Sequence, residues 1–144
     1  MITLQDYFQS YDSGPKRDLR DEFPLDMTPQ IETNAERTVE IVNALLGRFG
    51  EWRKVSSGWR PPSYNAKTVG ASRISLHMTG EAVDLSDRDG ELDDWCMGRE
   101  GEANLIRLGL WHEHPSSTRG LNGGEAQCHL QIRPPRSGNR HFYR

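Results

Sequence analysis

The chain lacks the features that mark several protein classes. It has only two cysteines, Cys96 and Cys128, too few for the disulfide framework of a small secreted domain. No apolar run approaches the ~20 residues that a membrane span needs. Residues 1–6 show no basic start followed by an apolar stretch, so we expect a protein made in the cytoplasm without a signal peptide. The formal net charge is -3, which argues against nucleic-acid binding.

The length of the chain is that of one domain. The 144 residues predict a single domain over 1–144, with an irregular or partly helical arm at 1–27 and a basic tail at 133–144. We expect it to be a monomer. The tail holds four arginines and no acidic residue, which suits either an anionic polymer such as cell wall or a solvated terminal arm.

Apolar spacing predicts an α+β fold, with a small antiparallel β-sheet flanked by helices. Apolar residues recur at helical spacing from Ile31 to Phe49, after a capping Thr28, and either Gly47 or Gly50 is expected to end the helix. Short helices and strands that do not alternate follow this helix. We expect helices at 91–97 and 99–108, strands at 55–57, 82–85, 110–114 and 128–132, and loops at 63–75 and 119–124. Pro134 and Pro135 are expected to end regular structure.

Two segments contain side chains that could ligate a metal ion. His77 precedes Asp84 by seven residues, and Gly80 lets the backbone turn between them. Imidazole and carboxylate are good zinc ligands, although two such residues alone are more typical of a capped turn with a surface carboxylate. In the second segment, Cys128 and His129 point to opposite faces of a strand, so they should not bind the same ion. We interpret His129 as the ligand and both cysteines as small buried hydrophobic residues.

The first segment carries a known signature. Ser75, His77, Gly80, Ala82 and Asp84 fill Ser-x-His-x-x-Gly-x-Ala-x-Asp, and the chain thereby resembles the zinc D-alanyl-D-alanine metallopeptidases, the hedgehog/DD-peptidase group. Two other segments resemble the same family, over roughly residues 30–140 in all. They are Ser57-Gly58-Trp59-Arg60-Pro61 and His129-Leu130-Gln131. In addition, the Pro-Pro-x-Ser-Gly run near the end of the chain is similar to that of small phage and prophage members.

The resemblance implies a hedgehog/DD-peptidase-like fold and one zinc ion held by His77, Asp84 and His129. Three protein ligands and an open position are typical of a catalytic zinc site. A general base is also needed, and two carboxylates compete for that role. Small phage members often carry a Glu after Leu-Trp, which favours Glu113. Glu125 lies four residues before His129. Some relatives place their base three residues before this ligand, so Glu125 misses that position by one residue.

The resemblance also implies roles for residues around the metal. Arg60 is expected to bind a peptide carboxylate, because a guanidinium pairs with it through two parallel hydrogen bonds. Ser75 and Gln131 are expected to bind substrate or to brace the metal site. Trp59 fits either a cleft wall or the core. His112 and His114 are expected at the rim of the site or behind its ligands, on the face opposite Glu113, and His141 on the surface.

These expectations lead to a zinc peptidase that cuts stem peptides of bacterial peptidoglycan. The bond is left open between D-Ala-D-Ala, L-Ala-D-Glu and a cross-link, as is the identity of the metal. Without a signal peptide, the enzyme would act on the cell wall as a phage lysis protein or a virion component. The alternative is a non-catalytic virion part or binding module that keeps the metal site, because fold alone does not establish function.

Overall fold

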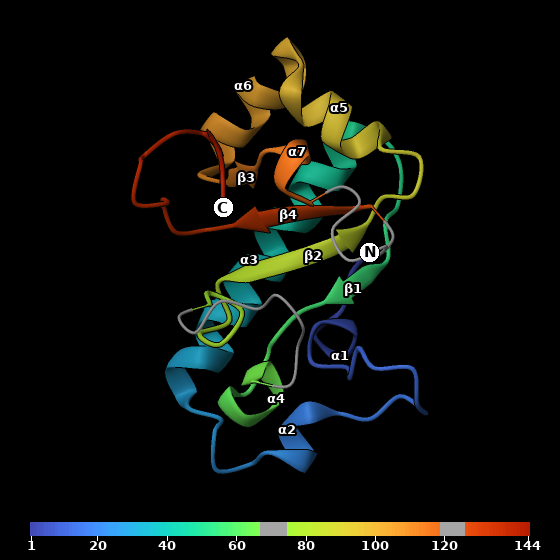
Figure 1. Cartoon of the computed structure of the whole chain (residues 1–144), viewed down its shortest axis with the longest axis vertical. Helices are drawn as coiled ribbons and strands as arrows, with labels where there is room; N and C mark the ends of the chain where they lie inside the picture. The colour runs from blue at the N-terminus through green and yellow to red at the C-terminus, as the bar shows by residue number, and fades with distance from the viewer. Residues whose placement is uncertain (67–74, 119–125) are drawn as a thin grey trace.

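We describe residues 1–66, 75–118 and 126–144 of a computed structural model of the chain, in which the expected α+β fold is confirmed (Figure 1). Within these residues a five-stranded sheet has the order β1-β2-β4-β3-β5. The strands are β1 (Val55–Ser57), β2 (Ala82–Ser86), β3 (Trp111–Glu113), β4 (Gln127–Gln131) and β5 (His141–Phe142). The helices are α1 (Leu4–Tyr7), α2 (Leu19–Glu22), α3 (Pro29–Phe49), α4 (Pro62–Ala66), α5 (Glu91–Met97), α6 (Arg99–Leu108) and α7 (Pro115–Thr118). In the part of the chain described, no helix combines the length and hydrophobicity of a membrane span.

The sheet is antiparallel except at one edge. β2 pairs with β4 over five residues, with Asp84 opposite His129. β5 runs parallel to β3, so the sheet is mixed. The expectation that regular structure ends at Pro134 is therefore wrong, because the chain turns back after the prolines and Phe142 is buried beside Glu113. Helix α4 likewise occupies part of the expected loop at 63–75, and residues 67–74 and 119–125 lie outside the described structure.

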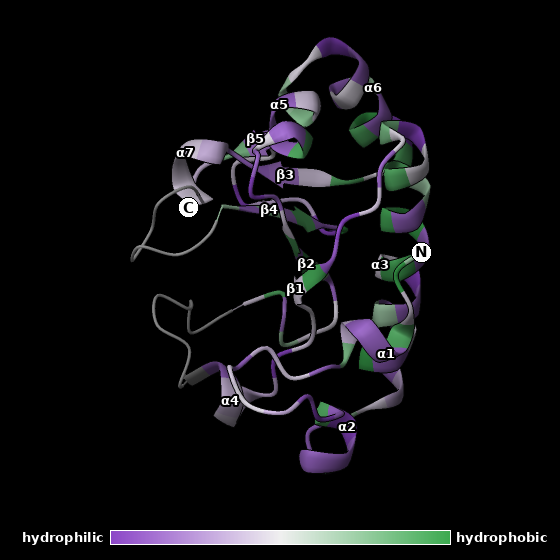
Figure 2. Ribbon diagram, turned by 90° about the vertical axis from the view of Figure 1, so that its right-hand side faces the viewer, coloured by the Kyte–Doolittle hydropathy of each residue, from purple (hydrophilic) through white to green (hydrophobic). Residues whose placement is uncertain are grey.

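Helix α3 covers one face of the sheet (Figures 1 and 2). Thr28 caps it as expected, and Gly50 ends it in a left-handed conformation. Its buried side chains join those of two central strands in one core. The strand residues of this core are Val83, Leu85, Cys128 and Leu130. Because side chains alternate along a strand, Asp84 and His129 project from the opposite face of the sheet.

The N-terminal segment is part of this core. Tyr7 and Phe8 are fully buried. The Tyr7 hydroxyl donates a hydrogen bond to the Ala82 carbonyl at 2.8 Å, and the Tyr7 carbonyl accepts one from the Trp59 amide at 3.1 Å. The segment thus anchors both the start of β2 and the residues that follow β1.

Gly80 fastens the turn that carries His77 to helix α3. Its φ is +80°, and a Cβ there would lie 2.7 Å from the Ile31 carbonyl oxygen. Two α3 side chains form hydrogen bonds to the same turn. The Thr38 hydroxyl donates to the Gly80 carbonyl at 2.8 Å, and the Asn34 amide donates to the Thr79 carbonyl at 2.9 Å. Only a glycine combines this backbone angle with so close an approach.

We predict that Gly80→Ala lowers the free energy of unfolding by about 1–3 kcal/mol, because it adds left-handed strain and a backbone clash. The matched control is Gly47→Ala, within α3, where a Cβ would meet nothing within 4 Å. That change should raise stability by about 0.5–1 kcal/mol. Denaturant unfolding of both variants measures the two effects, and equal stability of Gly80→Ala and wild type would contradict the assignment.

Candidate metal centre

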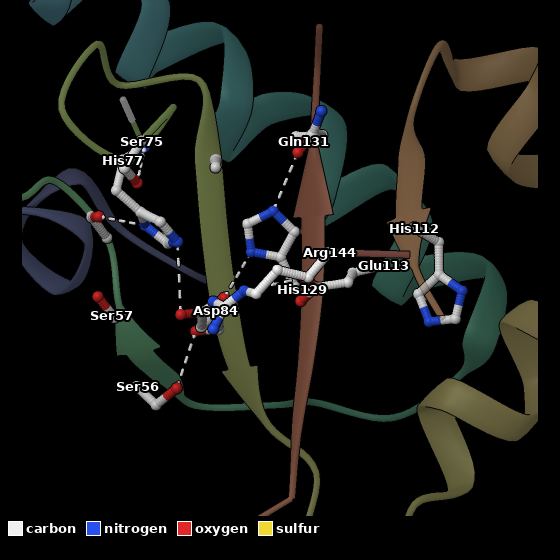
Figure 3. A network of polar contacts seen from close by, with 12 residues as sticks. Ser56, Ser57, Ser75, His77, Asp84, His112, Glu113, His129, Gln131 and Arg144 are labelled. Carbon is white, nitrogen blue, oxygen red and sulfur yellow. Dashed lines mark hydrogen bonds and ion pairs between the residues drawn. The ribbon is translucent and has the colours of Figure 1, made fainter. Parts of the chain in front are cut away.

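His77, Asp84 and His129 converge on one point at the open face of the sheet (Figure 3). His77 comes from the turn before β2, and the other two lie opposite each other on β2 and β4. The Nε2 atom of His77 is 3.4 Å from Asp84 Oδ2, and the Nδ1 atom of His129 is 2.7 Å from Asp84 Oδ1. One ligand atom from each residue lies within 4.8 Å of the others. The expected ligand set is therefore assembled in space.

Hydrogen bonds outside the centre orient both imidazole rings. His77 Nδ1 lies 2.8 Å from the Gly58 carbonyl, which can only accept, so Nδ1 carries the proton and Nε2 presents a lone pair to Asp84. The amide nitrogen of Gln131 donates to the Arg133 carbonyl, which turns its Oε1 toward His129 Nε2 at 3.1 Å. In the neutral ring, His129 Nδ1 then presents a lone pair to Asp84.

This donor set fits a divalent cation. A ring lone pair and a carboxylate oxygen 2.7 Å apart repel each other unless a proton or a cation lies between them. Burial lowers the pKa of His77, which favours its neutral, ligating form. Burial alone would also lower the pKa of His129, but the contact with Asp84 outweighs it and raises the pKa. Two histidines and one carboxylate, each oriented by an outer partner, are typical of zinc centres.

Asp84 stays ionised although it is buried. Burial by itself raises its pKa, but His77 and His129 outweigh that effect and hold the pKa well below its usual range. The guanidinium of Arg60 adds a further cation, with Nη2 2.9 Å from Asp84 Oδ2. Arg60 is itself buried, and its Nε donates to the Ser57 hydroxyl at 2.8 Å. The structure thus gives Arg60 a partner that the sequence did not suggest, the carboxylate of the candidate ligand Asp84.

Ser75 and Gln131 contact the ligand residues. The Ser75 hydroxyl accepts a hydrogen bond from the His77 amide at 3.2 Å, and Gln131 contacts His129 as described. Each of the two residues therefore contacts one candidate ligand residue. Sequence reasoning missed Ser57 as a partner of Arg60 and the Gly58 carbonyl as a partner of His77. Both lie in the segment that resembles the family, but only the folded chain shows what they touch.

Glu113 points from β3 toward the same centre (Figure 3). It is buried, and burial raises its pKa, while His129 and Arg144 oppose that rise. Arg144 Nε lies 3.5 Å from Glu113 Oε1. Nothing in the sequence near Glu113 signals this contact, because 31 residues separate the two side chains. The competing carboxylate, Glu125, lies outside the described residues.

Two histidine predictions are wrong. His112 is fully buried in the core rather than at the rim or against a candidate ligand, with Nε2 2.7 Å from Asp93 Oδ1. Strand alternation placed it correctly opposite Glu113, but that face of β3 is covered by other elements (Figure 3). His141 contacts the His112 ring at 2.9 Å and is largely buried rather than on the surface. Trp59 is fully buried, so its core interpretation is the one that the structure supports.

The chain was compared with protein-family models, curated proteins and solved structures. The model of a protein family described as Peptidase M15 matches residues 19–102, more than half of the chain. This range contains the Arg60, Ser75, His77 and Asp84 positions and ends before Glu113 and His129. A search of curated proteins and a search of solved structures found no significant match.

The orienting role of Gln131 can be tested by metal affinity. We predict that Gln131→Ala weakens zinc binding about 10- to 100-fold, because His129 loses the hydrogen bond that fixes its ring and tautomer. Competition with a chromogenic chelator measures this change. Gln127→Ala is the control on the same strand, since Gln127 lies outside the ligand hydrogen bonds, and it should bind zinc as wild type does. Equal affinities for the two variants would exclude the role.

Proposed function

The chain belongs to the peptidase M15 family, and from this premise we propose that it is a zinc-dependent peptidase that hydrolyses stem peptides of bacterial peptidoglycan. The family is one of zinc-dependent metallopeptidases and implies a peptide substrate. The observation that carries the proposal is the orientation of the two ring lone pairs toward Asp84, with a buried Glu113 on the same side of the sheet.

His77, Asp84 and His129 would hold one zinc ion. The chemistry that zinc supplies in such a site is polarisation of a carbonyl and acidification of water, whose pKa falls to about 7. Gly58, Gln131 and Arg60 hold the three ligands from outside, so the donor atoms need little rearrangement. Pre-oriented groups of this kind lower the cost of reaching a reactive geometry.

Glu113 is the proposed general base. Its carboxylate would accept the proton of the attacking water and pass it to the leaving amine. The pKa of this carboxyl is raised by burial, which brings it closer to the operating pH and makes the carboxylate a better proton acceptor. The position of Glu113 on β3, beside β4, sets this group near His129 without any contribution from a loop.

Arg60 is proposed to bind a carboxylate of the substrate as well as Asp84. Its Nε and Nη2 atoms contact Ser57 and Asp84, so the substrate would be met by Nη1. One guanidinium would then join the substrate to a metal ligand and set the distance between the peptide end and the scissile bond. Ser75 and Gln131 would support this arrangement by bracing the metal ligands.

The proposal is tested by digestion of purified peptidoglycan with zinc-loaded protein. Mass spectrometry of the products should show newly hydrolysed stem peptides, and the fragments identify which of the three candidate bonds is cut. Intact stem peptides across several wall types, from protein shown to hold its metal, would instead support a binding module.

Variants assign the base in the same assay. Glu113→Gln should retain zinc but lose about 10²- to 10⁴-fold in turnover, because the amide cannot take up the proton. Glu125→Gln tests the competing carboxylate, and His77→Ala should lose the zinc ion of this centre together with activity. If Glu113→Gln cleaves at the wild-type rate, Glu113 is not the base, whatever the outcome for the other two variants.

The Arg144 contact predicts a shift in pH dependence. Because Arg144 lowers the pKa of Glu113, Arg144→Ala should raise that pKa, and the base then needs a higher pH to be ionised. The acidic limb of the kcat/KM profile should therefore move to higher pH. Arg136→Ala, which changes an exposed arginine of the same terminal segment, is the control and should leave the limb in place. An unmoved limb in Arg144→Ala would show that the ion pair does not act on the base.

A further inference from the structure

A second group of metal-ligating side chains lies on the core face of the sheet. The sulfur atoms of Cys96 and Cys128 and a ring nitrogen of His112 lie within 4.8 Å of one another, and all three residues are fully buried. Asp93, which is also fully buried, adjoins His112, with Oδ1 2.7 Å from His112 Nε2. The four side chains are two thiols, one imidazole and one carboxylate, which is a donor set suited to zinc.

The fold brings these four residues together from two layers. In the sheet, His112 on β3 pairs with Leu130 on β4, and Cys128 lies two residues from Leu130 on the same face. His112 and Cys128 are therefore diagonal neighbours across the two strands. Above them, Asp93 and Cys96 lie three residues apart in α5, so they share one side of that helix. Each layer supplies two donors.

A chain of hydrogen bonds orients His112 in the same way as the ligand histidines of the first centre. The carboxylate of Glu102 only accepts, so His141 Nε2, 3.1 Å away, donates to it. In a neutral His141 ring, Nδ1 then accepts from His112 Nδ1, at 2.9 Å. A neutral His112 is left with a lone pair on Nε2, and this lone pair faces Asp93 Oδ1. His129 and Asp84 show the same arrangement at the same distance of 2.7 Å.

We propose that Cys96, Cys128, His112 and Asp93 form a second, structural site for a zinc-type divalent cation. Binding would exchange the two thiol protons for the cation and release both protons to solvent, so the net charge of the cluster would stay the same. Four protein donors without solvent exposure leave no open position, which is typical of a structural rather than a catalytic site. The bound ion would tie α5 to β3 and β4.

Such a link would affect the first centre from the opposite face of the sheet. Cys128 immediately precedes the ligand His129 on β4, and His112 immediately precedes Glu113 on β3. An ion that links Cys128 and His112 therefore fixes the spacing of the two strands at the point where their other face carries a ligand and the proposed base. This inference does not depend on the peptidase activity, because it concerns a separate set of donors.

Metal stoichiometry and cobalt spectroscopy test the proposal. Protein purified after growth with zinc should contain two equivalents, His77→Ala one, and the double variant Cys96→Ala/Cys128→Ala one. Cobalt-substituted wild type should show a thiolate-to-cobalt charge-transfer band in the near ultraviolet. Since none of the three ligands of the first centre is a sulfur, this band reports the second site alone. It should persist in His77→Ala and vanish in the double variant, while Met97→Ala, an exposed neighbour on α5, serves as the control.

The wild-type spectrum decides the matter even if the double variant does not fold. One equivalent of metal without a thiolate band would overturn the proposal, and so would a mass showing that Cys96 and Cys128 are joined as a disulfide in the purified protein. Loss of peptidase activity alone would not overturn the second site, because activity depends on the first centre. Two equivalents with the thiolate band in an inactive protein would support the second site and reject the proposed function.

Discussion

The antiparallel register of β2 against β4 is the constraint on which the rest of the site depends. It sets Asp84 opposite His129 and keeps Cys128 and Leu130 on the other face. A slip of one residue would turn every side chain of a strand to the opposite face. His129 would then enter the core and Cys128 would reach the open side. Burial of Leu85 and Leu130 opposes this slip, since each such side chain stabilises the fold by about 1.5–3 kcal/mol when fully buried.

The polar residues behind the ligands follow from the burial of Asp84. A buried carboxylate without a partner costs several kcal/mol, and one cation alone seldom compensates for the loss of water. Here Arg60 supplies a full charge, and His77 and His129 hold the pKa of Asp84 low. The outer nitrogens of these two rings contact the Gly58 carbonyl and the Gln131 amide oxygen. The segment around β1 and the end of β4 are therefore as much a part of the centre as its ligands.

Sequence patterns predicted what depends on local periodicity. Spacing predicted the helices α3, α5 and α6 and the strands at 55–57 and 82–85, and the structure has these elements within one or two residues of the expected bounds. It also predicted that Cys128 and His129 lie on opposite faces of their strand, as they do. Alternation also placed His112 opposite Glu113, but it could not tell which face would be covered. The Arg144 contact and the strand β5 arise from residues far apart in the chain, and local patterns hold no information about them.

The charge of Asp84 is the feature that links the groups on the open face of the sheet. The contact with Asp84 raises the pKa of His129, and His77 and His129 hold the pKa of Asp84 low, so Asp84 and His129 each favour the charged form of the other. In the proposed function, a zinc ion would take the place of a proton on His129 and would use the same donor atoms. The strand register, the Arg60 pair and the two outer hydrogen bonds hold the three side chains that would bind it. The geometry of this face therefore follows from strand pairing and from the burial of one carboxylate.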